Sequence, residues 1–151
     1  MSEDTQSPCY RVGIAYNLKH EKEGEPEDEQ AEYDSISTIR TIAGAIEKTG
    51  CKAVFIEARE DFPEKIKKAD VDFVFNIAEG KGGRGREAQV PSILNLYSIP
   101  YTGSDETTLC IALDKGIAKK IVKSRGIKTP VFFIWKNNET DIPSRLRFPV
   151  I

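Results

Sequence analysis

The sequence VDFVFNIAEGKGGRGRE, residues 71–87, joins a short apolar run to a glycine-rich segment. Residues 71–77 are rich in valine, phenylalanine and isoleucine, which favours a buried strand. Glycine fills four of the six positions 80–85, and a helix is predicted over residues 86–97, although Pro91 lies inside it. A strand that leads through a loop into a helix is typical of α/β proteins.

The segments on either side of this stretch continue the alternation. Strands are predicted over residues 11–17 and 52–56, and a short strand-like piece over residues 99–102. Helices are predicted over residues 33–48, where isoleucines recur at helical spacing, and over residues 61–69. The order β-α-β-α-β-α-β with short links predicts a parallel sheet covered by helices.

The organisation changes near residue 105. Two helices, a strand, a polar turn and the start of another strand are predicted over residues 107–113, 115–125, 131–135, 136–143 and 148–151. Trp135 and its aromatic neighbours are expected in the core, and Cys110, on an apolar helix, is expected to be buried. No cap or polar tail follows the last predicted strand, so the chain is expected to be a truncated portion of a longer protein.

Composition excludes several classes of protein. Charged residues are nearly balanced, with a formal net charge of −2, which argues against a nucleic-acid partner. No apolar run is long enough to span a membrane, and residues 1–10 do not form a secretory signal, so a cytoplasmic location is expected. The chain has three cysteines and a single histidine, His20, which argues against a disulfide framework, a histidine-based triad and a metal cluster. Seven acidic residues lie within residues 20–32, which is typical of a solvated loop.

The glycine-rich segment has three readings. Gly80, Gly82 and Gly85 satisfy the G-x-G-x-x-G pattern of dinucleotide-binding proteins, and Asp105 lies where such a unit places its ribose-binding acid. Glu79 argues against this reading, because its carboxylate beside a pyrophosphate would be repulsive. The second reading is a flexible loop whose glycines only allow a turn. The third is a loop that faces a substrate.

Several short motifs resemble the D-alanine–D-alanine ligases and their relatives in the ATP-grasp superfamily. They are IPYTGSD at residues 99–105, LDK at 113–115, AKK at 118–120 and GIKTP at 126–130, together with residues 75–89. The resemblance covers residues 10–151 and implies a Rossmann-like pre-ATP-grasp domain over residues 10–105 and the beginning of an ATP-grasp domain over residues 106–151; residues 1–9 are expected to be a disordered tail. It also implies ATP and Mg²⁺, an acyl-phosphate intermediate, a dipeptide-type product and a role in peptidoglycan biosynthesis.

The resemblance also implies roles for individual residues. Lys115 would contact ATP phosphates, with a solvated lysine as the alternative. Glu32 would hold the amino group of the first substrate, with a charge at a helix N-terminus as the alternative. Glu79 would lie at the substrate, where many of these ligases carry histidine, and this departure places D-alanine itself in question as the substrate. Arg86 is expected at the substrate, and Arg86 and Glu87 could also pair with each other.

Asp105 and Asp114 are expected to begin helices rather than to act in catalysis. The family's second ATP lysine, its glycine-rich flap and its acidic metal ligands lie beyond the last residue here, so tight Mg-ATP binding and ligation by this chain alone are not expected. The expected partners are an amino acid or a related carboxylate and amine, and the family's dimers make a homodimer an option. The alternatives are a non-catalytic α/β module that binds a partner and a dinucleotide-binding domain.

Overall fold

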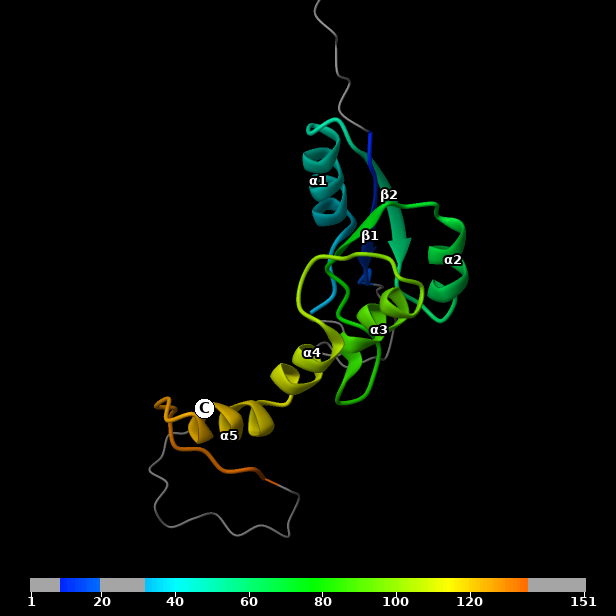
Figure 1. Ribbon diagram of the computed structural model, residues 1–151. Coiled ribbons are helices and arrows are strands. Elements are labelled where there is room, and N and C mark those ends of the chain that lie inside the picture. Colours follow the sequence, from blue (N-terminus) through cyan, green and yellow to red (C-terminus); the bar gives the residue numbers. More distant parts are fainter. Residues whose placement is uncertain (1–8, 20–31, 136–151) are drawn as a thin grey trace, which may run out of the picture.

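The computed structural model describes residues 9–19 and 32–135. Three strands form a parallel sheet in the order β2-β1-β3, with β1 spanning Arg11–Tyr16, β2 Lys52–Glu57 and β3 Phe73–Asn76 (Figure 1). The first strand in the sequence therefore occupies the centre of the sheet. Five of its six residues are buried, as expected for a strand paired on both edges and covered on both faces.

A fourth segment extends the sheet beyond β3. Val74 forms a parallel bridge with Tyr101, the Val74 amide donates to the Pro100 carbonyl at 2.8 Å, and the Thr102 amide donates to the Val74 carbonyl at 2.9 Å. The strand-like piece predicted over residues 99–102 is therefore confirmed as a single bridge. The predicted alternation of strands and helices in the first part of the chain is also confirmed.

Helices cover the two faces of the sheet (Figure 1). On one face lies α1, Ile36–Glu47, whose Ile39 and Ala43 are buried against β1. The other face is covered by α2, Phe62–Lys68, and α3, Gln89–Leu96. The chain is thus an α/β protein with helices on both sides of a parallel sheet, as its sequence predicts.

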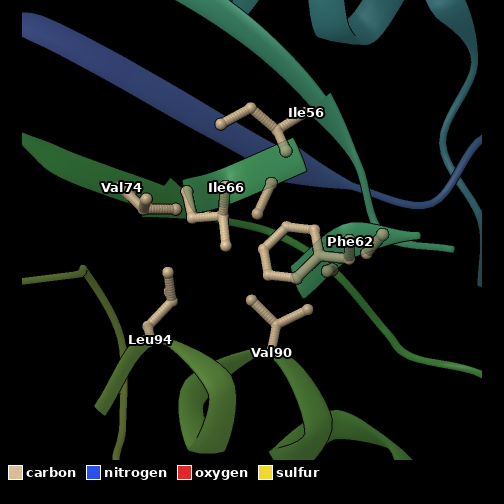
Figure 2. Packing of buried hydrophobic residues seen from close by; sticks show 9 residues of the cluster. Ile56, Phe62, Ile66, Val74, Val90 and Leu94 are labelled. Carbon is tan, nitrogen blue, oxygen red and sulfur yellow. The ribbon is translucent and has the colours of Figure 1, made fainter. Parts of the chain in front are cut away.

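The larger apolar cluster lies between the sheet and the second pair of helices (Figure 2). In Figure 2, side chains from α2 and α3 point toward side chains of β2 and β3; the labelled members are Ile56, Phe62, Ile66, Val74, Val90 and Leu94. Full burial of each such side chain contributes roughly 1.5–3 kcal/mol. This cluster fixes α3, and with it the loop that leads into α3, relative to the carboxyl ends of the strands.

The helix predicted over residues 86–97 is divided in two. A short 3-10 turn, Arg86–Ala88, precedes α3, which begins at Gln89. Pro91 is therefore the third residue of α3 rather than an interior residue. The first turn of a helix has no intrahelical acceptor for its amides, so proline is tolerated there without a kink.

Two helices follow the sheet. They are α4, Glu106–Leu113, and α5, Lys115–Ser124. Asp105 accepts a hydrogen bond from the Thr108 amide at 2.7 Å, and Asp114 accepts one from the Ile117 amide at 2.9 Å. Both aspartates therefore cap helices, as predicted.

Three predictions about the last described segment and its surroundings are wrong. Residues 131–135 form no strand, because no other described segment pairs with them. Trp135 is 51% exposed and contacts Phe133 edge to face at 6.2 Å between ring centroids, so it is not a core residue. Cys110 is exposed, because α4 presents no buried face among the described residues. Apolar character alone does not bury a side chain whose neighbours are few.

Other predictions fall on residues that the structure does not describe. These are the tail over residues 1–8, most of the acidic segment, the polar turn and the last strand, at residues 1–8, 20–31, 136–143 and 148–151. Among the described helices, none has the length and apolar character that a membrane span needs.

Candidate functional site

The carboxyl ends of the three strands meet at one edge of the sheet, and the candidate residues gather there. Asn17 follows β1, residues 58–60 follow β2, and residues 77–80 follow β3. The chain order reverses between β1 and β3, because β2 lies on the far side of β1. In open α/β sheets this switch point at the carboxyl edge is where ligands bind.

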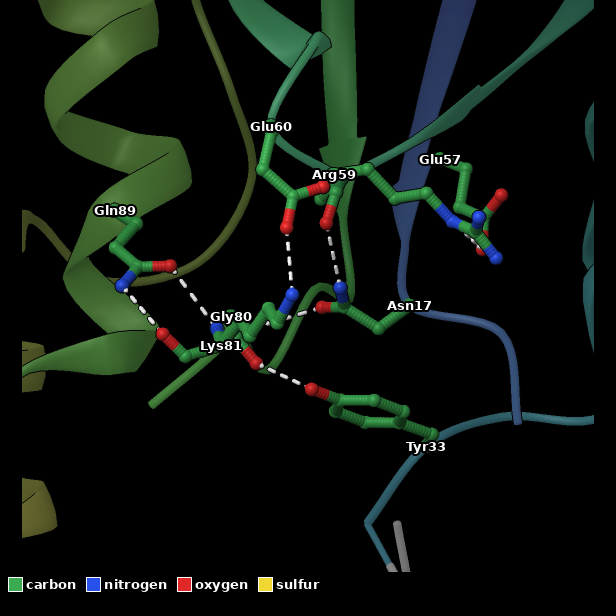
Figure 3. Close-up of polar contacts among 9 residues, drawn as sticks. Asn17, Tyr33, Glu57, Arg59, Glu60, Gly80, Lys81 and Gln89 are labelled. Carbon is green, nitrogen blue, oxygen red and sulfur yellow. Dashed lines mark hydrogen bonds and ion pairs between the residues drawn. The ribbon is translucent and has the colours of Figure 1, made fainter. Parts of the chain in front are cut away.

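Two side chains hold the start of the glycine loop at this edge (Figure 3). The Asn17 side-chain oxygen accepts a hydrogen bond from the Gly80 amide at 2.8 Å, and its side-chain nitrogen donates to the Ala58 carbonyl at 2.7 Å. The Tyr33 hydroxyl donates to the Gly80 carbonyl at 2.9 Å. Asn17 is only 6% exposed, so these bonds replace the water that the amide has lost. Gly80 is therefore fixed through both its amide and its carbonyl.

The side-chain amide of Gln89 binds the backbone of Lys81, the residue after Gly80, through two hydrogen bonds (Figure 3). The Gln89 side chain accepts from the Lys81 amide at 3.0 Å and donates to the Lys81 carbonyl at 2.9 Å. The Lys81 ammonium pairs with Glu60 at 2.6 Å. A pocket of about 300 Å³ lies beside this ion pair, between the loops and helices α2 and α3, with Phe62 and Ile93 in its wall.

Three residues assigned to the substrate by resemblance come together next to Gly80. The Arg86 guanidinium pairs with the Glu32 carboxylate. Burial raises the pKa of the Glu79 carboxyl above its usual value, and the nearby Glu87 and Glu32 carboxylates raise it further, against an opposing effect of Arg86. Arg86 thus pairs with Glu32, whereas the sequence left a pair with Glu87 open. Glu32, Glu79 and Arg86 form what we call the acidic cluster, together with Glu87 and Asp34.

Glu32 does not cap α1. Ser35 does so, because its hydroxyl accepts a hydrogen bond from the Thr38 amide at 3.2 Å. The hydrogen-bonding cap of α1 is therefore supplied by Ser35, and the role of Glu32 stays a prediction.

Lys115 lies elsewhere, as the first residue of α5. It is exposed, and its ammonium donates to the Ala112 carbonyl at 3.1 Å. The preceding residue, Asp114, pairs with Arg84 of the glycine loop. The structure therefore joins the lysine's helix to the loop of the acidic cluster through this one described ion pair.

The chain is similar to known proteins in sequence and in fold. No established protein-family profile matches the chain. It is 32% identical over 125 residues to the D-alanine–D-alanine ligase of Carboxydothermus hydrogenoformans, covering 78% of this chain and 39% of that one. The crystal structure of the Bacillus anthracis D-alanine–D-alanine ligase complexed with ATP superposes with a TM-score of 0.68 at 28% identity, covering 91% of this chain and 43% of that one. The chain is related to the D-alanine–D-alanine ligases.

The relationship covers part of a ligase. The chain spans about two fifths of the length of the two D-alanine–D-alanine ligases just described. An uncharacterised protein of Sinorhizobium fredii is 40% identical over 78 residues, which is 52% of this chain and 23% of that protein. The chain is therefore also similar to a protein whose name states no substrate.

The geometry around the glycine loop of this chain disfavours dinucleotide binding. The glycine loop follows β3 and not the first strand, and a 3-10 turn separates Gly85 from α3. A pyrophosphate in a dinucleotide fold rests on a helix N-terminus directly after the loop. Asp105, the candidate ribose-binding acid, accepts the capping bond from Thr108 instead.

The sequence alone did not indicate that Asn17, Tyr33 and Gln89 belong to the site. A signal existed for Asn17, because a polar residue directly after a buried strand lies at the carboxyl edge of a parallel sheet. Tyr33 and Gln89 carried none, since each contacts a partner that only the folded chain brings close. Within the described residues, no group of three or more acidic, histidine or cysteine side chains could hold a metal ion.

Because the pKa of Glu79 is raised, its replacement by glutamine is predicted to increase the stability of the fold, and the increase is predicted to depend on pH. Burial destabilises the anion in the folded state, so Glu79 lowers stability above its folded pKa and has no effect below 4.5, its ordinary value, where it is protonated in both states. We expect Glu79→Gln to raise the melting temperature at pH 7 and to leave it unchanged at pH 4. Thermal unfolding at both pH values measures this difference. Equal melting temperatures at pH 7 would show that Glu79 is not strained as an anion.

Proposed function

We propose that this chain is the substrate-binding portion of an ATP-dependent carboxylate–amine ligase. The observation that carries the proposal is the gathering of Glu32, Glu79 and Arg86 at the β1/β3 switch point, beside a loop that is fixed through Gly80. Relatives that share this part of the chain are D-alanine–D-alanine ligases. The proposed division is a Rossmann-like domain over residues 10–105, followed by the opening of an ATP-grasp domain from residue 106.

The charge of the acidic cluster suits an amine. The carboxylates of Glu32, Asp34 and Glu87 act on the Glu79 carboxyl and raise its pKa, and Arg86 opposes them, so carboxyl groups outnumber the cation at this point. Such an excess of negative charge favours an ammonium group, and Glu79 would regain stability as an anion when a cation binds beside it. Glu32 is the proposed partner of the substrate ammonium, and Arg86 orients Glu32. The substrate's own carboxylate is then left free to react.

Lys115 is the proposed contact for ATP phosphates. It lies at the N-terminus of α5, where the helix dipole and the ammonium both favour an anion. The Bacillus anthracis neighbour was crystallised with ATP. In the proposed reaction an oxygen of the substrate carboxylate attacks the γ-phosphorus of ATP, the bond from that phosphorus to the bridging oxygen breaks, and ADP leaves as the acyl phosphate forms. The amine of the second substrate then displaces phosphate and forms the amide bond.

Such a reaction uses Mg²⁺, and among the described residues no group of three or more acidic, histidine or cysteine side chains could hold a metal ion. No step is therefore assigned to magnesium through these side chains. What they do in the proposed reaction is to position the first substrate and to offset phosphate charge, the two contributions that dominate phosphoryl transfer.

Calorimetric titration of the protein in its full natural length tests the proposal. We expect Mg-ATP to bind and NAD to bind weakly or not at all. Binding of NAD without ATP would restore the dinucleotide reading of the glycine loop. Binding of neither would favour a non-catalytic α/β module.

Glu32→Gln is expected to raise the KM for the amino-acid substrate about 10- to 100-fold in the full-length protein, with the KM for ATP little changed. The reason is that a charged hydrogen bond to an ammonium contributes roughly 1.5–3 kcal/mol. Steady-state kinetics with D-alanine as the probe measures both constants. The matched control is Glu47→Gln, the same substitution at the end of α1. A KM that stays at the wild-type value would remove Glu32 from the substrate site.

A further inference from the structure

One ion pair joins the two regions that the proposed function uses separately. Arg84 belongs to the glycine loop, and its guanidinium contacts the carboxylate of Asp114, 30 residues away. The side chain of Asp114 is 20% exposed and that of Arg84 is 81% exposed. The pair therefore lies at the surface, between the loop of the acidic cluster and the start of α5.

Asp114 has a structural task at the same time. One of its carboxylate oxygens accepts from the Ile117 amide at 2.9 Å and caps α5, and the other contacts Arg84. The next residue in the chain is Lys115. Arg84 thus holds the residue from which the helix of the proposed phosphate-binding lysine begins.

The charge of Asp114 means that its contact with Arg84 affects the binding of a phosphate near Lys115. The hydrogen bond from Arg84, together with the capping amide of Ile117, holds the pKa of the Asp114 carboxyl below its usual value, so the group is an anion at neutral pH. A lone carboxylate adjacent to Lys115 would repel a phosphate. Arg84 offsets that charge.

Arg84 is also close in the sequence to the acidic cluster. Arg84 lies four residues after Gly80, which Asn17 and Tyr33 fix, and two residues before Arg86, which pairs with Glu32. A displacement of α5 that moved Asp114 would therefore pull on a loop that carries both Glu79 and Arg86.

We propose that Arg84 is a positioning residue that couples nucleotide binding at the start of α5 to the order of the acidic cluster. The proposal rests on the proposed function, because it needs a nucleotide at Lys115. Binding free energies are reciprocal, so an amino acid that orders the loop would also increase the affinity for ATP.

A double-mutant cycle tests the link. The affinity of the full-length protein for the magnesium complex of adenylyl imidodiphosphate, which is not hydrolysed, is measured by calorimetry. We expect Arg84→Gln to weaken binding about threefold, the scale of an exposed ion pair. In the background of Asp114→Asn, which keeps a capping oxygen but not the charge, the same substitution should have almost no effect.

The cycle separates positioning from direct contact. If Arg84 bound phosphate itself, Arg84→Gln would weaken binding equally in both backgrounds, and that result would overturn the proposal. If Arg84→Gln had no effect in the wild-type background as well as in the Asp114→Asn background, the proposal would also be overturned. The matched control is Asp105→Asn, which alters the corresponding cap of α4, where the Thr108 amide is bound at 2.7 Å. It should leave the affinity unchanged.

Hydrogen exchange provides a readout that does not depend on activity. In the wild-type protein, the nucleotide analogue should slow amide exchange in residues 80–87, and in Arg84→Gln it should not. Wild-type protein that binds the analogue with no change in these amides would disprove the coupling and leave the proposed function intact. Failure of the wild-type protein to bind the analogue would remove both.

Discussion

Gly80→Ala is expected to destabilise the fold by about 3 kcal/mol or more. The backbone φ of Gly80 is +71°, a conformation that disfavours a side chain by roughly 1–2 kcal/mol. A Cβ there would also lie 2.0 Å from the carbonyl oxygen of Arg86, which is backbone and cannot turn aside. The loop would have to move, and the hydrogen bonds to Asn17 and Tyr33 would be strained or lost. Urea unfolding measures the change in free energy.

Gly82→Ala is the matched control. Gly82 also has a positive φ, of +63°, but a Cβ there would meet nothing within 4 Å. Only the conformational penalty of roughly 1–2 kcal/mol should remain. If both substitutions cost the same, the close approach of Arg86 to Gly80 would have no energetic weight. The view that Gly80 sets the position of Glu79 would then fall.

Lys115→Ala in the full-length protein is expected to weaken the binding of Mg-ATP about 10- to 100-fold. A charged hydrogen bond to phosphate contributes roughly 1.5–3 kcal/mol, and an exposed lysine contributes little to the fold. The melting temperature should therefore stay close to that of the wild type, while calorimetry shows the loss of affinity.

Two controls separate a specific role from general charge. Lys120→Ala removes an exposed lysine from the same helix and should have little effect. Lys115→Arg keeps the charge and should recover part of the affinity. Equal losses at positions 115 and 120 would mean that the helix attracts the nucleotide only through its overall charge, and Lys115 would lose its assigned role.

The architecture was largely predictable because apolar runs and helical spacing record which residues are buried. Helices and strands of the first part begin and end within three residues of their predicted bounds, including α3, which begins at Gln89 rather than at residue 86. The strand expected over residues 131–135 was wrong, since a strand exists only with a partner. The predictions that Trp135 and Cys110 are buried were wrong for a related reason, because burial depends on neighbours that composition does not reveal.

The sequence predicted which segments meet at the site, but it did not predict which residues contact each other there. Residues that follow parallel strands meet at one edge, so a shared location for the loop after β3 and the segment after β1 follows from the topology. The pairing of Arg86 with Glu32 crosses 54 positions, and that of Gly80 with Asn17 crosses 63. Partners at such separations are selected by the packed fold, and no local pattern announces them.

The central place of β1 has a consequence during synthesis. β1 is complete at Tyr16, but its second neighbour, β3, begins only at Phe73, about 57 residues later. At roughly 5–20 residues per second, the ribosome needs about 3–11 s to make that stretch. Throughout that time one edge of an apolar strand has no partner from its own chain. Chaperones that bind nascent apolar segments would meet this protein at its first strand, and slower translation would lengthen the exposure.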